Sequence, residues 1–233
     1  MKRMGSKLSL FGLATSCALT LVGCAPEAMR PEQRDKFLAD QFQKISTLSE
    51  CCADWSAASF KKSIESQSSD FEFGTEASLV HKFGGQLLPI EGFALPTFAK
   101  SYQLDFVSFS SGRYSALRFD NKLFIRANAL LLDASFTTIK TIENPPAFAK
   151  QDHGDFALYT RFTIDRSDAA YIVFYPSLSP ATQQIDTRLG SDGTLGMAPG
   201  DANIASSIAD ARKSYLADLT LGISGLAALR VSR

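Results

Sequence analysis

Short apolar runs with a period of two fill the middle of this chain, and they constrain its fold more than any other feature. The clearest run covers residues 102–109, where Tyr102, Leu104 and Phe106 alternate with other residues. Alternation of this kind places successive side chains on opposite faces of the backbone and is typical of a half-buried β-strand. Similar runs occur at 70–74, 114–119, 123–127, 136–142, 156–164 and 171–175, and a solid apolar run covers 129–133.

Turn-forming residues interrupt these runs about every ten residues, for example at 110–112, 144–146 and 165–168. This spacing predicts a mainly β fold, an antiparallel β-sandwich of the jelly-roll kind. Helical character is confined to a short N-terminal stretch and to a segment near 204–216, so a parallel α/β sheet is not expected. We assign the sandwich to residues 53–233, with a loop and helix insertion at about 180–220.

The composition argues against some classes of partner and cofactor. The 233 residues include 24 Lys and Arg and 24 Asp and Glu, so the net charge is zero, whereas nucleic-acid binding favours a basic surplus. Only two His and four Cys are present, which leaves few ligands for a zinc site. No P-loop, dinucleotide-binding or HExxH motif occurs. We therefore expect no nucleic-acid partner, no metal and no organic cofactor.

The first 23 residues have the pattern of a secretory signal peptide. Three cations, Lys2, Arg3 and Lys7, precede an uncharged, mostly apolar stretch at 8–22 that is shorter than the roughly 20 residues of a membrane-spanning helix. The stretch ends in Leu21-Val22-Gly23-Cys24, which resembles the lipobox of bacterial lipoproteins. We therefore predict cleavage before Cys24 and lipidation of that residue. An ordinary signal peptide with an incidental cysteine is the alternative.

Lipid on Cys24 would tether the mature chain to a membrane surface in the periplasm. The next residue is Ala25. By resemblance to enterobacterial lipoproteins, a residue other than aspartate at this place implies the outer membrane. Residues 24–52 are interpreted as a tether followed by a short amphipathic helix at 32–49, whose apolar stripe includes Phe42 and Ile45. The helix is expected to dock on the domain, with a partner-binding role as the alternative.

Cys51 and Cys52 are adjacent and are the free thiols that remain after cleavage of Cys17 and acylation of Cys24. Because the periplasm is oxidising, two idle thiols would be unusual. We favour a vicinal disulfide between them. Intermolecular bridges that form a dimer, and a metal or redox role, are the alternatives, although the usual C-x-x-C spacing of redox sites is absent.

Several stretches follow one another in an order that resembles a known family. They are Cys51-Cys52 with the aromatic-bearing segment after it, the Phe-x-Leu-Pro step at 93–96, the Leu-rich strand and turn at 130–136, the strand at 171–175 and the closing strand at 225–231. Together they are similar to the maltose operon periplasmic protein (MalM-like) family over roughly residues 50–231. The resemblance implies a periplasmic β-sandwich linked to maltodextrin uptake. It supplies no catalytic residues, because the family has none established.

Exposed aromatic side chains are the candidates for a carbohydrate site, because sugar rings stack on them. Trp55 and Tyr114 lie nearest to expected loops, whereas the other tyrosines fall in strands and are more often core or cross-strand pairs. We therefore expect a non-enzymatic envelope lipoprotein that binds a carbohydrate or a partner protein. One alternative is an envelope hydrolase that uses a loop containing Asp152, His153 and Asp155; another is an assembly factor bridged through Cys51 or Cys52.

Overall fold

The structure, a computed structural model, describes ten stretches of the chain. These are residues 31–52, 54–58, 60, 62–64, 70–75, 78–109, 123–152, 155–178, 185–186 and 220–232. The signal peptide, the lipidation residue Cys24, the candidate Tyr114, the expected strand at 114–119 and the expected helix near 204–216 lie outside the described residues.

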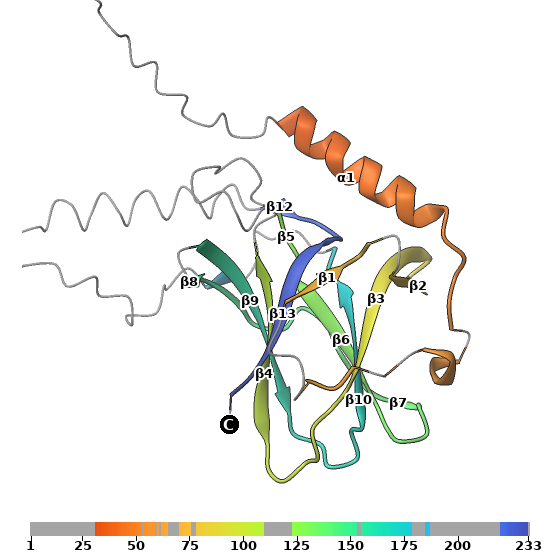
Figure 1. The fold of residues 1–233 in the computed structure, drawn as a ribbon, viewed down its shortest axis with the longest axis vertical. Helices are drawn as coiled ribbons and strands as arrows, with labels where there is room; N and C mark the ends of the chain where they lie inside the picture. The colour runs from red at the N-terminus through yellow and green to blue at the C-terminus, as the bar shows by residue number, and fades with distance from the viewer. Residues whose placement is uncertain are drawn as a thin grey trace, which may run out of the picture.

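The described strands form two large sheets that pack face to face (Figure 1). One sheet has the order β1 (Phe71–Phe73), β13 (Gly225–Ser232), β4 (Tyr102–Phe109), β9 (Asp155–Ile164), β8 (Ala147–Asp152) and β11 (Ile185–Asp186). The other has the order β2 (Leu79–Phe83), β3 (Gln86–Ala94), β10 (Tyr171–Pro176), β6 (Ala127–Leu132) and β7 (Thr138–Ile142). A small third sheet pairs β12 (Thr220–Leu221) with β5 (Leu123–Phe124). All pairings are antiparallel except β11 with β8 and β12 with β5.

The strand order is that of a jelly roll. Within the two large sheets, β1-β13-β4-β9 face β3-β10-β6-β7, and the chain crosses repeatedly from one sheet to the other. The first and last strands of this set, β1 and β13, pair with each other, as the two nested Greek keys of a jelly roll require. β2 and β8 extend the two sheets as hairpin partners of β3 and β9. The predicted antiparallel β-sandwich is therefore confirmed.

The core lies between the two sheets and is built from the side chains that the alternation selects. The Phe106 ring of β4 lies 5.2 Å from the Phe174 ring of β10, so the contact joins the two sheets. Phe73 packs its ring edge-to-face against Phe106 with 5.6 Å between centroids. Other buried members of this cluster include Phe93, Leu104, Leu131, Phe162 and Ile172. Burying rings of this size is the main stabilising contribution to such a sandwich.

The strand expected at 136–142 begins two residues later than predicted. Phe136 has a φ of 63° and lies in a turn, and β7 starts only at Thr138. The reason is Asp133, whose Oδ1 accepts hydrogen bonds of 2.9 Å from the backbone N–H groups of Ser135 and Thr137. A side chain that satisfies these donors holds the backbone in a turn before the strand can begin.

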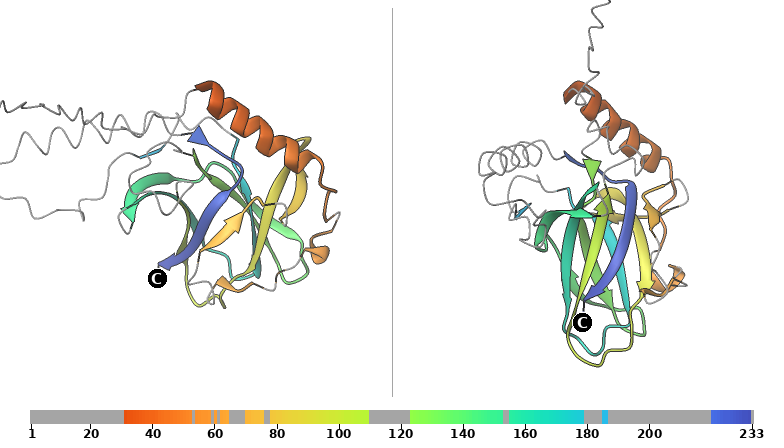
Figure 2. Two further views of the ribbon diagram at one scale, coloured as in Figure 1. Left: turned by 45° about the horizontal axis from the view of Figure 1, so that its top comes forward. Right: turned by 60° about the vertical axis from the view of Figure 1, so that its left-hand side comes forward.

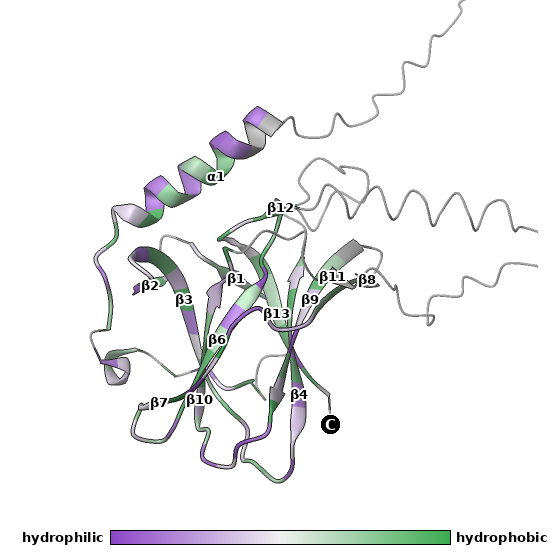
Figure 3. Cartoon of the chain, turned by 180° about the vertical axis from the view of Figure 1, so that it is seen from behind, coloured by the Kyte–Doolittle hydropathy of each residue, from purple (hydrophilic) through white to green (hydrophobic). Residues whose placement is uncertain are grey.

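The N-terminal helix α1 (Pro31–Ser46) lies across one end of the sandwich (Figure 2). Its buried residue Ile45 forms a small apolar cluster with Val80 of β2 and Ile223, and Phe42 and Leu48 pack against this cluster. The Ile223 N–H also donates a 3.3 Å hydrogen bond to Gln41 Oε1. Apolar and polar residues alternate around the helix (Figure 3), which leaves its polar side for solvent. Among the described residues, no helix has both the length and the apolar character to cross a membrane.

Candidate functional site

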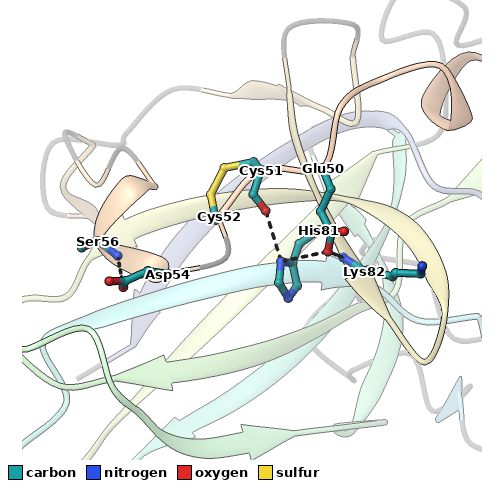
Figure 4. Close-up of a disulfide and its surroundings, with 7 residues drawn as sticks. All are labelled: Glu50, Cys51, Cys52, Asp54, Ser56, His81 and Lys82. Atoms are coloured by element: carbon teal, nitrogen blue, oxygen red, sulfur yellow. Dashed lines mark hydrogen bonds and ion pairs between the residues drawn. A yellow bond between two sulfur atoms is a disulfide. The ribbon is translucent and has the colours of Figure 1, made fainter.

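Cys51 and Cys52 lie between α1 and the short 3₁₀ helix η1 (Trp55–Ala57), and a disulfide joins their sulfur atoms (Figure 4). Cys52 has a φ of 69°, in the left-handed region of the backbone. Its side chain is buried on the outer face of the five-stranded sheet, in a cluster that includes Leu88, Leu130 and Val173. The disulfide is thus an apolar contact of the sheet as well as a covalent link.

Backbone and polar contacts attach this segment to the edge strand β2. The Cys51 N–H donates a 2.7 Å hydrogen bond to the carbonyl oxygen of Val80. His81 Nδ1 lies 3.3 Å from the carbonyl oxygen of Cys51, which can only accept, and 3.8 Å from Glu50 Oε1. Glu50 Oε1 also accepts from the Lys82 N–H at 3.2 Å (Figure 4). Glu50 and Cys51 are therefore held against three consecutive residues of β2, Val80 to Lys82.

Trp55 begins η1 and is half-buried beside this attachment. Asp54 caps the 3₁₀ helix, because its carboxylate accepts a 2.9 Å hydrogen bond from the Ser56 N–H. The Trp55 ring lies 4.6 Å from the His81 ring, and His81 meets Phe83 edge-to-face at 5.0 Å. These contacts orient the indole at the border between the sheet and solvent.

The ring contacts continue across the sheet from Phe83 to Tyr175 of β10, whose rings stack with 3.9 Å between centroids. Trp55, His81, Phe83 and the Cys51–Cys52 disulfide together are called the Trp55 platform below. Trp55, His81, Phe83 and Cys51 are all partly exposed. Half-exposed rings held by neighbouring side chains provide a fixed surface against which a ligand can stack.

A second aromatic group occupies the other end of the same outer face. Phe60, Phe136 and Tyr171 pack in a triangle, with ring centroids between 4.6 and 5.5 Å apart. All three are partly buried and lie beside strand β3 or the turn before β7. This group covers the sheet beside the buried Ala58, so we assign it a packing role.

Glycoside hydrolysis needs two carboxylates that face each other across the sugar, and the acidic residues Asp105, Glu91 and Asp133 are candidates by residue type alone. Each of the three is engaged by a different group. Asp105 accepts from Arg161, Glu91 Oε2 accepts from Lys62 Nζ at 3.0 Å, and Asp133 caps the turn before β7. The pKa of the Asp133 carboxyl is lowered by the hydrogen bonds from Ser135 and Thr137. The structure does not bring these carboxylates together as a facing pair.

The loop of the hydrolase hypothesis connects the antiparallel neighbours β8 and β9. Asp152 ends β8 and Asp155 begins β9, and the two residues pair with each other. His153 lies outside the described residues. Among the residues that the structure does describe, no three His, Cys, Asp or Glu side chains are grouped so that they could share a metal ion.

The sequence pointed to Trp55 and the cysteine pair but not to His81 and Phe83 as their neighbours. Residues 79–83 alternate weakly, and Gly84 and Gly85, both with positive φ, form the turn to β3. A two-glycine turn between short apolar runs is a hairpin signal that could have placed His81 and Phe83 on one face. The distance from His81 to Trp55, in contrast, depends on the fold.

Comparisons of the chain with protein-family models, with curated protein sequences and with solved structures give no match. The functional argument therefore depends on the jelly-roll fold and on the side chains that it brings together. A fold alone does not specify a function, so the chemistry of the sites carries the argument.

Proposed function

We propose that the chain is a non-enzymatic, MalM-like lipoprotein of the bacterial cell envelope whose jelly roll binds a carbohydrate at the Trp55 platform. The observation that carries the proposal is the half-buried Trp55 ring, held against His81 at 4.6 Å beside the disulfide. A sugar ring presents C–H groups to an aromatic face, and a fixed ring loses little conformational entropy when it binds. His81 and Glu50 supply polar groups at the border of the same surface.

Two further features support this proposal. Jelly rolls recur among lectin domains, which is an argument by analogy of fold only. The motifs that resemble the MalM-like family and the lipobox at Cys24 favour a periplasmic protein tethered to the outer membrane, in an uptake system for maltodextrins. A membrane tether would keep a binding domain near the place where the sugar enters.

The test uses the fact that Trp55 is the single tryptophan of the chain. Its fluorescence therefore reports on the platform without interference. Titration with maltodextrins is expected to change the emission, and saturating sugar is expected to raise the unfolding temperature by about 5 °C or more, because ligand at 100 times its Kd adds about 2.7 kcal/mol. Trp55→Ala should abolish the rise, whereas Phe136→Ala, which removes a ring outside the platform, should retain it.

The same experiment can contradict the proposal. If neither maltodextrins nor peptidoglycan fragments change the emission or the unfolding temperature, carbohydrate binding is wrong and a protein partner, detected by crosslinking in intact envelopes, takes its place. The anchor is tested separately. Wild-type cells should incorporate labelled palmitate into the protein and Cys24→Ala cells should not; incorporation into Cys24→Ala would refute lipidation at this residue.

A further inference from the structure

Arg126 is a buried cation that the proposed function does not use. It lies between β5 and β6, and only 2% of its surface is exposed. Its chain neighbours Ile125 and Ala127 both belong to the core between the two large sheets. A guanidinium group keeps its charge at neutral pH, and an arginine is almost never buried to this degree unless an acidic group pairs with it. An acidic partner is therefore expected.

The described part of the chain supplies Arg126 with one side-chain hydrogen bond and no acidic partner. Nη2 donates to the carbonyl oxygen of Pro145 at 3.0 Å, whereas the buried Nε has no partner there. Burial lowers the pKa of the Arg126 guanidinium below its ordinary value, and no charged group of the described residues contributes to this change. A backbone carbonyl is neutral, so its contact leaves the positive charge without a counterion. A buried charge without a partner is strongly unfavourable.

Two other arginines show which group is missing at Arg126. Arg161 donates from Nε and Nη2 to the two carboxylate oxygens of Asp105, and Arg166 donates from the same two nitrogens to Asp168. These two N–H groups form a fork that matches two oxygens of a carboxylate or a phosphate. Among the described acidic residues, none occupies this fork at Arg126. The half-exposed arginines thus have an oxyanion partner and the buried one does not.

Polar contacts fix the backbone around Arg126. The Ser177 N–H donates a 2.7 Å hydrogen bond to the carbonyl oxygen of Arg126, and Ser177 Oγ donates to Asn144 Oδ1 at 3.1 Å. The Asn144 N–H in turn donates to Asn128 Oδ1 at 2.9 Å. Because Asn144 precedes Pro145, these contacts also hold the carbonyl group that Arg126 binds. The guanidinium is therefore positioned before any ligand arrives.

The guanidinium lies close beneath the surface of the domain. Asn144 and Pro146, on either side of the contacted Pro145, are exposed, and so is Leu178 next to Ser177. A small ion therefore needs only a local opening of this corner to reach Arg126. The low exposure of Arg126 itself leaves no surface for a sugar ring or a peptide to contact.

We propose that Arg126 binds a small oxyanion, a carboxylate or a phosphate, through the fork of its Nε and Nη2 groups. The anion supplies the missing negative charge, and its two oxygens accept from the two nitrogens. Nη2 carries two hydrogens, so the bond to Pro145 leaves one for the ion. Such an ion stabilises the folded chain, because the unfolded chain does not hold the fork and the Pro145 carbonyl together. The site does not depend on sugar binding at the Trp55 platform.

The experiment measures thermal unfolding of the full chain in mild detergent with sodium acetate, sodium phosphate or sodium chloride at equal ionic strength. Oxyanions such as phosphate also stabilise proteins non-specifically. The quantity compared is therefore the unfolding temperature in acetate or phosphate minus that in chloride, for the wild type and for Arg126→Met. We expect this difference to be larger in the wild type by about 3 °C or more when the oxyanion is in tenfold excess over its Kd. Arg166→Gln, which removes an exposed arginine, should behave as the wild type does.

The two oxyanion salts distinguish the chemical source of the ligand. A larger effect of acetate supports a carboxylate site, and a larger effect of phosphate supports a phosphate site. The same difference in the wild type and in Arg126→Met, with both salts, would overturn the proposal. Loss of sugar binding in Trp55→Ala should leave the effect of the oxyanions unchanged, so the two proposals can fail separately.

A second variant covers the case in which Arg126→Met does not fold. Arg126→Lys keeps the charge but lacks the fork of two N–H groups. Equilibrium dialysis with labelled acetate and labelled phosphate should find one of the two ions bound to the wild type, with a Kd about tenfold higher or more in Arg126→Lys. Absence of binding to the wild type, or equal binding to both proteins, would overturn the proposal.

Discussion

The ring of Phe60 lies directly on the backbone of Gly92 in β3. A Cβ atom at position 92 would come within 2.7 Å of Phe60 Cε1 and 2.9 Å of its Cδ1. The absence of a side chain at Gly92 therefore allows the Phe60 ring to lie against the outer face of the sheet. Gly92→Ala should displace the ring and lower the free energy of unfolding by about 1–2 kcal/mol, measured by urea denaturation.

A double-mutant cycle identifies the cause of that loss. In a Phe60→Ala background the added methyl group has no ring to displace, so Gly92→Ala should then cost much less than it does in the wild type. If Gly92→Ala lowers the free energy of unfolding equally in both backgrounds, the methyl group disturbs the strand itself and not the Phe60 ring.

Removing only one partner of the ion pair between Asp105 and Arg161 should lower the free energy of unfolding. Arg161→Gln leaves the nearly buried Asp105 carboxylate without its main donor, so we expect a loss of about 2–3 kcal/mol in the free energy of unfolding. The double variant Asp105→Asn/Arg161→Gln should recover part of this loss, because no buried charge remains. Chemical denaturation of the three proteins checks both statements, and additive losses would contradict the pairing.

The turn at Asp133 predicts a specific dependence of stability on pH. Hydrogen bonds from Ser135 and Thr137 lower the pKa of the Asp133 carboxyl in the folded chain below its unfolded value. The ionised Asp133 carboxylate therefore contributes to the free energy of unfolding above about pH 4. This contribution is lost as the pH falls through the folded pKa. At neutral pH, Asp133→Ala should unfold at a lower temperature than the wild type, and the two should converge in acid. A difference that persists unchanged in strong acid would assign the effect to packing.

Tyr175 should make the stability of the fold decrease as the pH rises, which is the opposite dependence to that of Asp133. Burial, with a smaller contribution from Glu143, raises the pKa of the Tyr175 phenol to about 12. Because the folded pKa lies above the unfolded one, the phenol contributes stability at neutral pH that is lost as the pH rises toward the folded value. Tyr175→Phe should flatten the fall in unfolding temperature above about pH 10. The phenolate absorbance of the wild type should include a tyrosine that ionises near pH 12 and that is missing from Tyr175→Phe.

The Cys51–Cys52 disulfide should contribute little to global stability. It closes the shortest loop that a chain offers, so Cys51→Ser/Cys52→Ser is expected to lose only about 1 kcal/mol. Its local effect should be larger, because Cys52 packs against the sheet beside Trp55. The emission of Trp55 should change when the disulfide is reduced. Protein that forms dimers on a non-reducing gel would contradict the intramolecular bond.

Some elements followed from local pattern and others did not. The alternation at 102–109 predicts strand β4 with its correct limits and places Tyr102, Leu104 and Phe106 in the core. Strand β3 had no comparable signal, because Pro89 and Gly92 interrupt its apolar run, and both residues are uncommon inside strands. The structure accommodates Pro89 opposite Val80 of β2, and Gly92 beneath Phe60. These are tertiary reasons that a local pattern does not contain.

The sequence by itself determined where several of the strands lie, β4 most exactly, which of their residues turn inward and that the sandwich is mainly antiparallel. These properties depend on neighbours within a few residues, because side chains alternate along any extended backbone. Only the tertiary structure decided which strands lie side by side. It placed Arg161 beside Asp105, 56 residues away, and Trp55 against His81. Pairings of this kind depend on the packing of the whole sandwich, since a strand offers the same hydrogen bonds to any partner. The Trp55 platform is built from such a pairing.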